Sequence, residues 1–499
     1  MKRRASTAGR VTCPTAPKPS SEGFSDESNR AASRRARLPN DGAQMSLVID
    51  SFAGGGGASL GITMALGRGP DVAINHDPEA LALHAVNHSR SRHLCENVLD
   101  VDPLAVCGNQ HVALMWSSPD CKHFSRAKGA KPVSTGVRGL AWVVVRWARA
   151  VHPDVVILEN VPEFTTWGPL LPNNMPDPAR RGLTFKRWWG QLRAAGYELE
   201  MRVIAASDYG APTTRRRLFI VARSDGRRIV WPEPTHGPGR RHPYRTAADC
   251  IQWDVPCPSI FERTRPLAAP TMNRIARGIR RFVLNAGDPF LLPTPHGGDA
   301  RVHSVDEPLR TVTGAHRGEN ALAAATLIQT GYGERAGRAP RALNLRRPVG
   351  TVVAGGSKHG LIAAYLAKHF GGHESPGGAM SAPFSAVTCR DHHALVTAKL
   401  GAGRHRREVR ALMGGPAIVK VGRDTFEIVD IGMRMLGARE LFRAQGFPDH
   451  YAIDVTTVSG RPLSKTAQIR MAGNAVCPPV AAALVAANVR LDEEKGRAA

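Results

Sequence analysis

Apolar segments of strand length alternate with segments of helical periodicity between residues 47 and 223. Residues 47–50, 112–116 and 154–159 are short and almost continuously apolar, which is typical of strands buried on both faces. Apolar residues between 140 and 151 recur at the spacing of one helix face. This alternation predicts an α/β domain in which helices cover a mostly parallel, Rossmann-like sheet.

The chain changes character after residue 223. Residues 224–430 are rich in Gly, Pro, His and Arg and have weak helical periodicity, so we expect an inserted, irregular and β-rich domain there. Helical patterning returns at Ile431, and we expect residues 431–499 to complete the first domain, which spans residues 45–223. Residues 1–44 are rich in Arg, Ser, Pro and Ala without periodicity, which predicts a disordered basic tail.

Three segments within the expected insert resemble one another. Residues 306–313, 346–353 and 381–388 each place a proline shortly before an extended pair of Thr or Val residues. A recurrence at roughly 35–40 residues indicates a repeated strand unit. Such a unit fits a ligand-facing module built from repeated loops, and it equally fits an internal duplication that serves only packing.

The formal net charge of +25 favours a polyanionic partner, with nucleic acid first and an anionic membrane second. A basic drift in composition would give the same charge without any partner. No apolar stretch approaches the ~20 residues of a membrane span, and residues 1–44 lack the apolar core of a signal peptide, so no membrane partner is expected. The eight cysteines form no CxxC pairs, which favours a reducing, cytoplasmic compartment and no metal site.

A run of four glycines at residues 54–57 separates the first strand from a helix. A turn of this kind lets the backbone approach a ligand closely, and Asp50 stands at the end of the strand. Taken alone, the run is compatible with any Rossmann-like cofactor site. It lacks the GxGxxG spacing of a dinucleotide site and the lysine-serine pair of a triphosphate site, so a nicotinamide oxidoreductase has only this loop in its favour.

Two further polar motifs follow apolar strands. Cys121 lies in a polar loop after the strand at 112–116, where a thiol is well placed to act as a nucleophile. Lys122 and His123 would favour its thiolate, whereas Asp120 would oppose it. Glu159 ends the next strand. A lone cysteine more often only packs, and a lone glutamate caps or pairs, but motifs at successive strand ends favour one shared site.

Six motifs, in order and spacing, resemble those of the cytosine-5 DNA methyltransferases. They are Phe52-Ala-Gly-Gly-Gly-Gly57, Pro119-Asp-Cys-Lys-His-Phe-Ser125, Glu159-Asn-Val161, Tyr209-Gly-Ala-Pro-Thr-Thr-Arg-Arg-Arg217, Arg439-Glu-Leu-Phe-Arg-Ala-Gln-Gly-Phe-Pro448 and Gly473-Asn-Ala-Val-Cys-Pro478. The resemblance covers residues 47–223 and 431–490. It implies an S-adenosylmethionine-dependent methyltransferase domain, with a target-recognition domain inserted at residues 224–430.

The resemblance implies transfer of a methyl group to carbon 5 of a cytosine that is flipped out of duplex DNA, at a cost on the order of a few kcal/mol. Carbon 5 is a poor nucleophile, and attack of a thiolate on carbon 6 makes it reactive. By the resemblance, Cys121 supplies that thiolate. Glu159, followed by Asn160, would hold the N3/N4 edge of the base. Arg215 would contact O2, and Arg217 would support the cysteine loop or a phosphate.

The resemblance also implies where S-adenosylmethionine binds. The glycine loop would line its methionine and ribose, and the C-terminal segment would close the pocket. An asparagine stands where the family commonly has a ribose-binding acid, and the histidine after it would flank the adenine or lie on the surface. The expected cofactor residues are Phe52, Ala53, Gly54, Gly55, Gly56, Asn75, His76, Asp100, Asn474 and Val476.

Four residues depart from the family pattern, namely Asn75, Asp120, Thr213 and Cys477. The departures leave open a DNA-binding homologue that has lost catalysis. The resemblance also leaves open an RNA cytosine-5 methyltransferase, because one branch of this family modifies tRNA. The expected partners are double-stranded DNA and a cognate restriction endonuclease. We expect a monomer that acts on DNA in the cytoplasm, associated with the nucleoid.

Overall fold

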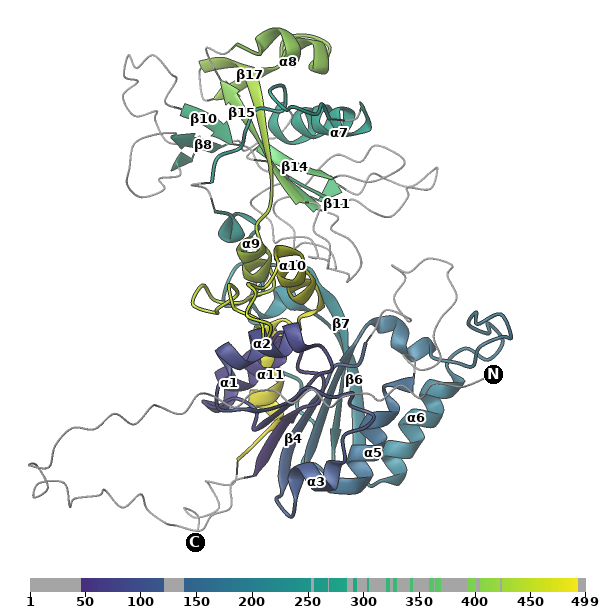
Figure 1. Cartoon of the computed structure of the whole chain (residues 1–499). Coiled ribbons are helices and arrows are strands. Elements are labelled where there is room, and N and C mark those ends of the chain that lie inside the picture. Colours follow the sequence, from purple (N-terminus) through teal and green to yellow (C-terminus); the bar gives the residue numbers. More distant parts are fainter. Residues whose placement is uncertain are drawn as a thin grey trace, which may run out of the picture.

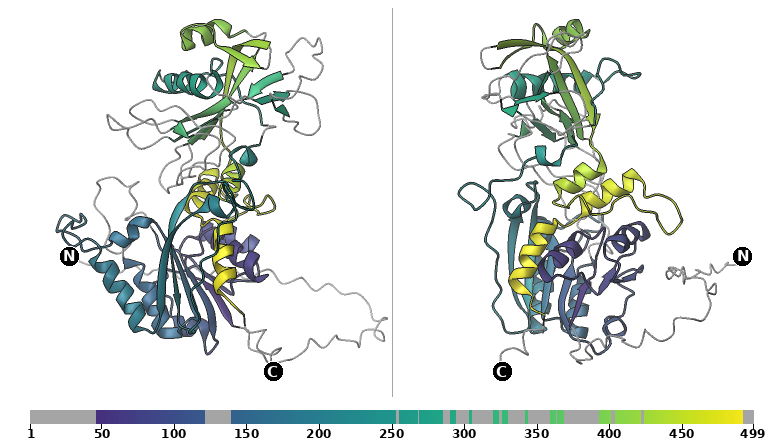
Figure 2. Two further views of the ribbon diagram at one scale, coloured as in Figure 1. Left: turned by 180° about the vertical axis from the view of Figure 1, so that it is seen from behind. Right: turned by 90° about the vertical axis from the view of Figure 1, so that its left-hand side faces the viewer.

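A computed structural model describes residues 46–120, 139–252, 255–267, 269–284, 404–421 and 424–491, together with short strands between residues 290 and 400. A large sheet with helices on both faces forms one body, and antiparallel strands form a second module (Figure 1, Figure 2). The predicted tail at residues 1–44 and the three proline-containing segments lie outside the described residues.

The large sheet has the strand order β3-β2-β1-β4-β5-β7-β6. Strand β7 is antiparallel to its neighbours β5 and β6, and the other neighbouring pairs are parallel. The predicted mostly parallel α/β fold is therefore confirmed. The strands are β1 (Leu47–Asp50), β2 (Val72–Ile74), β3 (Arg92–Leu94), β4 (Val112–Ser117), β5 (Val155–Asn160), β6 (Glu198–Ala205) and β7 (Arg216–Arg223).

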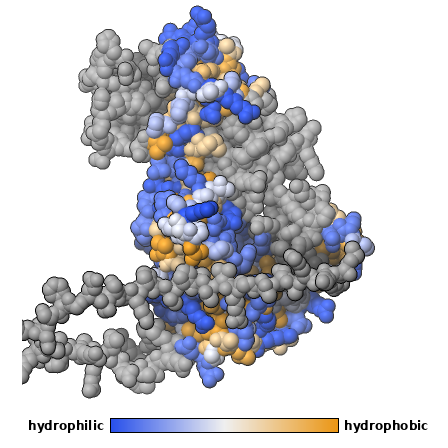
Figure 3. Space-filling view, in the orientation of Figure 1, coloured by the Kyte–Doolittle hydropathy of each residue, from blue (hydrophilic) through white to orange (hydrophobic). Residues whose placement is uncertain are grey.

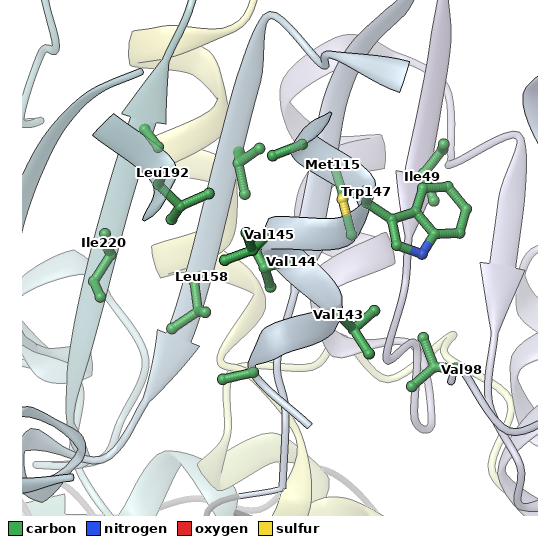
Figure 4. Packing of buried hydrophobic residues seen from close by; sticks show 14 of the residues in the cluster. Ile49, Val98, Met115, Val143, Val144, Val145, Trp147, Leu158, Leu192 and Ile220 are labelled. Atoms are coloured by element: carbon green, nitrogen blue, oxygen red, sulfur yellow. The ribbon is translucent and has the colours of Figure 1, made fainter. Parts of the chain in front are cut away.

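Both faces of the central strands are buried, which explains their continuous apolar runs. Successive residues alternate between two cores: Ile49 and Met115 pack with α5 (Trp142–Val151) and α6 (Leu183–Ala194), whereas Val48 and Leu114 pack with α1 (Gly57–Leu66) and α11 (Pro478–Asn488). Figure 4 shows the first core, in which Val144 and Trp147 of α5 lie against the sheet. The short helix α3 (Pro103–Cys107) joins this face.

The C-terminal segment returns to the first body. Helices α9 (Ala438–Ala444) and α10 (Lys465–Asn474) share a core with Leu60 of α1 and Leu83 of α2 (Pro78–Asn87). Arg470 of α10 adds ion pairs to Asp77 and Glu79 at the start of α2, at 2.9 and 2.7 Å. These contacts place the end of α10 against the glycine loop.

The second module begins where the chain leaves this core. Residues 247–251 still pack with α9 and α10, and β17 runs across residue 430, where the sequence analysis ends the insert. The domain boundaries remain predictions. The strands of the module are β8 (Phe290–Pro293), β9 (His303–Ser304), β10 (Asn320–Ala323), β11 (Thr326–Gln329), β12 (Ala342–Leu343), β13 (His359–Ile362), β14 (Ala364–Lys368), β15 (His393–Leu400), β16 (Ile418–Val421) and β17 (Asp424–Met435).

Two helices in the module, α7 (Ala269–Ile279) and α8 (Arg406–Met413), were not expected from its composition. In α8 only Val409 and Met413 are buried, a stripe too narrow to give a clear helical pattern. Figure 3 shows hydrophilic residues gathered over the end of the module that carries α8. The β-rich insert of the predicted fold thus includes short helices.

One stretch, Lys465–Asn488, reaches the length and hydropathy of a membrane span, although no such stretch was expected from the sequence. In the structure it is two helices, because α10 ends at Asn474 and α11 begins at Pro478. Of its most apolar window, 61% is buried inside the protein. Its hydropathy therefore reflects packing in the core between the sheet and the C-terminal helices.

Candidate active site

The glycine loop is held between β1 and the C-terminal segment. The Ser51 hydroxyl lies 2.7 Å from the Ser117 hydroxyl, which ties the loop to the end of β4. Tyr451 donates a hydrogen bond of 2.7 Å to the Gly55 carbonyl. Gly56 has φ +90°, and a Cβ there would lie 2.2 Å from the Tyr451 hydroxyl, so only glycine fits.

The end of α10 closes over the start of α1. A Cβ on Gly57 would lie 2.3 Å from the Val476 carbonyl oxygen, so the two backbones are in direct contact. Val476 is buried, and Asn474 is exposed two residues earlier. The structure therefore brings the predicted cofactor residues from both ends of the chain to one place beside the glycine loop.

Asp50 lies beneath this loop with its side chain fully buried. One carboxyl oxygen, Oδ2, accepts a 2.7 Å hydrogen bond from Ser59 of α1, whereas Oδ1 has no hydrogen-bond partner. Burial raises the pKa of Asp50 to about 7, against smaller opposing effects of the Ser59 hydroxyl and the Phe52 backbone. A buried carboxyl oxygen without a partner fits a cationic ligand group.

The remaining predicted cofactor residues follow β2 and β3. The Asn75 side chain accepts a 2.8 Å hydrogen bond from the backbone of Asp77 and so shapes the turn into α2. His76 is exposed on that turn. Asp100 is exposed in the turn before α3. Asn75 is thus fixed in place by its own turn, whereas the other two side chains face solvent.

Glu159, Arg215 and Arg217 form a buried cluster at the edge where β5 ends and β7 begins. The Arg217 Nε lies 3.0 Å from Glu159 Oε1, and an Arg215 terminal nitrogen lies 4.0 Å from the same oxygen. All three side chains are less than a tenth exposed. Arg215 also donates a 3.0 Å hydrogen bond to the Gly473 carbonyl, which links the cluster to the end of α10. The cluster thus holds two buried cations and one buried carboxylate, so one positive charge is in excess.

Asn160 connects this cluster to the end of β4. Its amide nitrogen donates a 3.1 Å hydrogen bond to the Pro119 carbonyl, and its oxygen accepts one of 2.9 Å from the Val161 backbone. Pro119 leads into the loop that carries Cys121. Cys121 itself, like the rest of residues 121–138, lies outside the described residues. Its predicted role therefore remains a prediction.

Two departures from the family pattern have local explanations. Thr213 is fully buried, and its hydroxyl accepts a 3.3 Å hydrogen bond from the Arg215 backbone, so it supports the turn before that arginine. Cys477 directly precedes α11, and its thiol lies 3.2 Å from the Gln445 side-chain oxygen. Burial raises the pKa of Cys477 to about 11, so this thiol stays protonated and is a poor nucleophile.

The sequence analysis noted Asp50 but assigned no role to this residue. It also missed a serine and three histidines that lie near Asp50. His84 of α2 is hydrogen-bonded to Ser59, and the rings of His88, directly after α2, and of His93 in β3 lie against His84. The spacing of His84 and His88, four residues apart on one helix face, was an available signal. Nothing in the sequence indicated that Ser59 would join them.

The family model described as C-5 cytosine-specific DNA methylase matches residues 47–258 and 385–490, which together exceed half of the chain. The chain belongs to the C-5 cytosine-specific DNA methylase family. The predicted family resemblance is therefore confirmed. The match runs past residue 223 and resumes before residue 431, in keeping with the packing of residues 247–251 and the path of β17.

Curated relatives of this methylase domain include bacterial Type II enzymes. Type II methylase M.HgiDII of Herpetosiphon aurantiacus is 31% identical over 212 residues, covering 41% of this chain and 53% of its own length. Type II methyltransferase M.XorII of Xanthomonas oryzae pv. oryzae is 29% identical over 227 residues, covering 43% and 48%. The chain thus spans about half the length of these relatives.

The solved Dnmt2 methyltransferase of S. pombe covers 88% of this chain at 11% identity and TM-score 0.45, and this chain covers 97% of it.

Proposed function

We propose that this chain is a DNA (cytosine-5-)-methyltransferase that transfers a methyl group from S-adenosylmethionine to carbon 5 of cytosine in duplex DNA. The observation that carries the proposal is the buried Glu159–Arg215–Arg217 cluster. It lies at the same edge of the sheet as the glycine loop, and Asn160 joins it to the end of β4. Membership in the C-5 cytosine-specific DNA methylase family supports this assignment.

The glycine loop fits S-adenosylmethionine, which supplies an electrophilic methyl group when bound. Phe52 and residues 53–56 would line the methionine and ribose portion, and Val476 would close the pocket. Asp50 Oδ1, buried and without a hydrogen-bond partner, would face the positive charge of this ligand. Asn75, His76 and Asp100 would serve the ribose and the adenine.

The base-binding side follows from the buried cluster. Glu159 would hydrogen-bond the N3/N4 edge of a flipped cytosine, and the two arginines would hold the carboxylate in place. The Cys121 thiolate would attack carbon 6 and make carbon 5 nucleophilic, and it would leave after the carbon-5 proton is removed. In the sequence, Cys121 follows by two positions Pro119, whose carbonyl accepts the hydrogen bond from Asn160.

The same proposal includes the partners. The net charge of +25 suits a duplex DNA substrate, which the second module would read. Relatives named Type II methylases support a role in restriction-modification with a cognate endonuclease. We propose a monomer that acts in the cytoplasm in association with the nucleoid.

Transfer of tritiated methyl groups from S-adenosylmethionine tests this function. We expect incorporation into duplex DNA of mixed sequence, none into tRNA, and 5-methylcytosine as the modified nucleoside after digestion. Label in tRNA alone would assign the chain to RNA, and label recovered as N4-methylcytosine would contradict the chemistry. Absence of label from every substrate, with the cofactor bound, would indicate a DNA-binding homologue without catalysis.

A further inference from the structure

A continuous chain of hydrogen bonds leads from the floor of the glycine loop to strand β3. Ser59 Oγ is 2.7 Å from Asp50 Oδ2 and 2.9 Å from His84 Nε2, and His84 Nδ1 is 2.8 Å from His93 Nε2. Asp50, Ser59 and His84 are fully buried. His93 is only partly buried, so the chain connects the buried carboxyl group to the surface.

The two ends of this row of hydrogen bonds are Asp50 and His93, and they differ in their hydrogen bonding. Asp50 Oδ1, the carboxyl oxygen that does not bond to Ser59, is buried beside the glycine loop without a hydrogen-bond partner. His93 makes a hydrogen bond to the Ser91 backbone that favours its protonated form. Because Nε2 of His93 already faces His84, the other ring nitrogen donates to Ser91. This fixes one proton on His93 and leaves its Nε2 to accept or donate along the chain.

With that proton fixed, the row of hydrogen bonds from Asp50 to His93 has two arrangements in which every bond is made. In the first, Asp50 is protonated and donates to Ser59, Ser59 donates to His84 Nε2, and His84 Nδ1–H donates to His93. In the second, every one of these bonds reverses: Asp50 is ionised, His84 carries its proton on Nε2, and His93 is an imidazolium. The two differ by the net movement of one proton from Asp50 to His93.

The surroundings favour the first arrangement when no cation is near. Burial lowers the pKa of His84 well below its usual range, with the rings of His88 and His93 acting in the same direction. Burial also lowers the pKa of His93. The other titratable groups packed here are His88, whose pKa is lowered by burial to about 4, and Tyr451, whose pKa is raised by burial and by Asp50. No fixed positive charge among them favours ionised Asp50.

We propose that Asp50, Ser59, His84 and His93 form a proton path, along which binding of the cationic methyl donor at Asp50 moves one proton to His93 at the surface. The inference rests on the proposed function, because that function supplies the cation. Ser59 and His84 are then positioning residues of the cofactor site. They allow Asp50 to be neutral in the empty pocket and negative when a sulfonium and an ammonium group are present.

Ring nitrogen shifts of ¹⁵N-histidine-labelled protein at pH 7 report both changes directly. On addition of saturating S-adenosylmethionine, we expect His84 to change from the Nδ1–H to the Nε2–H tautomer and His93 to take imidazolium shifts. Glutamine variants of the two histidines would assign the signals. A His84 tautomer and a His93 charge that stay unchanged in the bound protein would overturn the proposal.

Ser59→Ala breaks the path between Asp50 and His84. We expect this variant to bind S-adenosylmethionine at least about tenfold more weakly and to show no change at His84 or His93. Thr63→Val is the matched control, because Thr63 lies on the same helix and its hydroxyl donates to the Ser59 backbone carbonyl, not to the Ser59 hydroxyl. It should retain both the affinity and the histidine changes.

Calorimetric titration separates this inference from the proposed function. Failure of the wild type to bind S-adenosylmethionine would contradict the proposed function itself. Binding by the wild type with normal histidine changes in Ser59→Ala would contradict only the proton path. Should Ser59→Ala fail to fold, His93→Phe, altered at the partly exposed end, should still bind the cofactor and lose the tautomer change at His84.

Discussion

Cys121→Ser is expected to lower the rate of methyl transfer to DNA by at least about a thousandfold, leaving the affinity for S-adenosylmethionine unchanged. An alcohol is ionised far less than a thiol at neutral pH and attacks carbon 6 poorly, whereas the cofactor pocket is built from other residues. Single-turnover methylation of duplex DNA measures the first quantity, and calorimetric titration measures the second.

The matched control is Cys95→Ser, because Cys95 is exposed and follows β3, which is separated from β5 and β7 by other strands of the sheet. It should methylate DNA at the wild-type rate. If Cys121→Ser also kept near wild-type activity, Cys121 would not be the nucleophile. Loss of cofactor affinity along with activity would instead show that the substitution had disturbed the pocket.

Glu159→Gln is expected to reduce the turnover number by about a hundredfold or more, with little change in cofactor affinity. Glutamine keeps the shape of the side chain but loses the charge that, in the proposed function, would stabilise a protonated cytosine ring. Glu159 is buried beside Arg217 and Arg215, so its neutralisation also leaves two buried cations uncompensated. Removal of one partner from a buried ion pair costs about 3–5 kcal/mol, so thermal stability should fall as well.

A double variant separates catalysis from folding. Glu159→Gln combined with Arg217→Gln returns the cluster to the net charge that it has in the wild type, so part of the lost stability should return while activity stays low. Glu198→Gln, on the exposed start of β6, is the control for loss of a glutamate and should leave activity and melting temperature unchanged. Recovery of activity in the double variant would show that Glu159 acts only through folding.

The central strands of the large sheet were predictable because they are buried on both faces, which forces apolar residues at successive positions of β1, β4 and β5. Gly56 and Gly57 were predictable as a tight turn, although their neighbours Tyr451 and Val476 lie about four hundred residues away in sequence. The direction of β7 was not predictable, since burial gives parallel and antiparallel strands the same pattern here.

The polar partners of the site were the least predictable part. Glu159 and Arg217 meet because β5 and β7 are neighbours in the sheet, which their separate apolar patterns do not encode. Ser59 and His84 meet because α1 and α2 pack together, and a single serine on a helix carries no signal of its own. Hydrogen bonds between distant elements depend on packing geometry, so periodicity and spacing do not reveal them.

Trapping on DNA that carries 5-fluorocytosine tests the covalent step most directly. Fluorine at carbon 5 cannot be removed as a proton, so the enzyme should remain bound to the base once the methyl group has been transferred. After incubation with S-adenosylmethionine, peptide mass mapping should find the DNA attached to the peptide that contains Cys121. Full methylation of ordinary DNA, with only free protein or an adduct at another residue on the fluorinated DNA, would contradict the account.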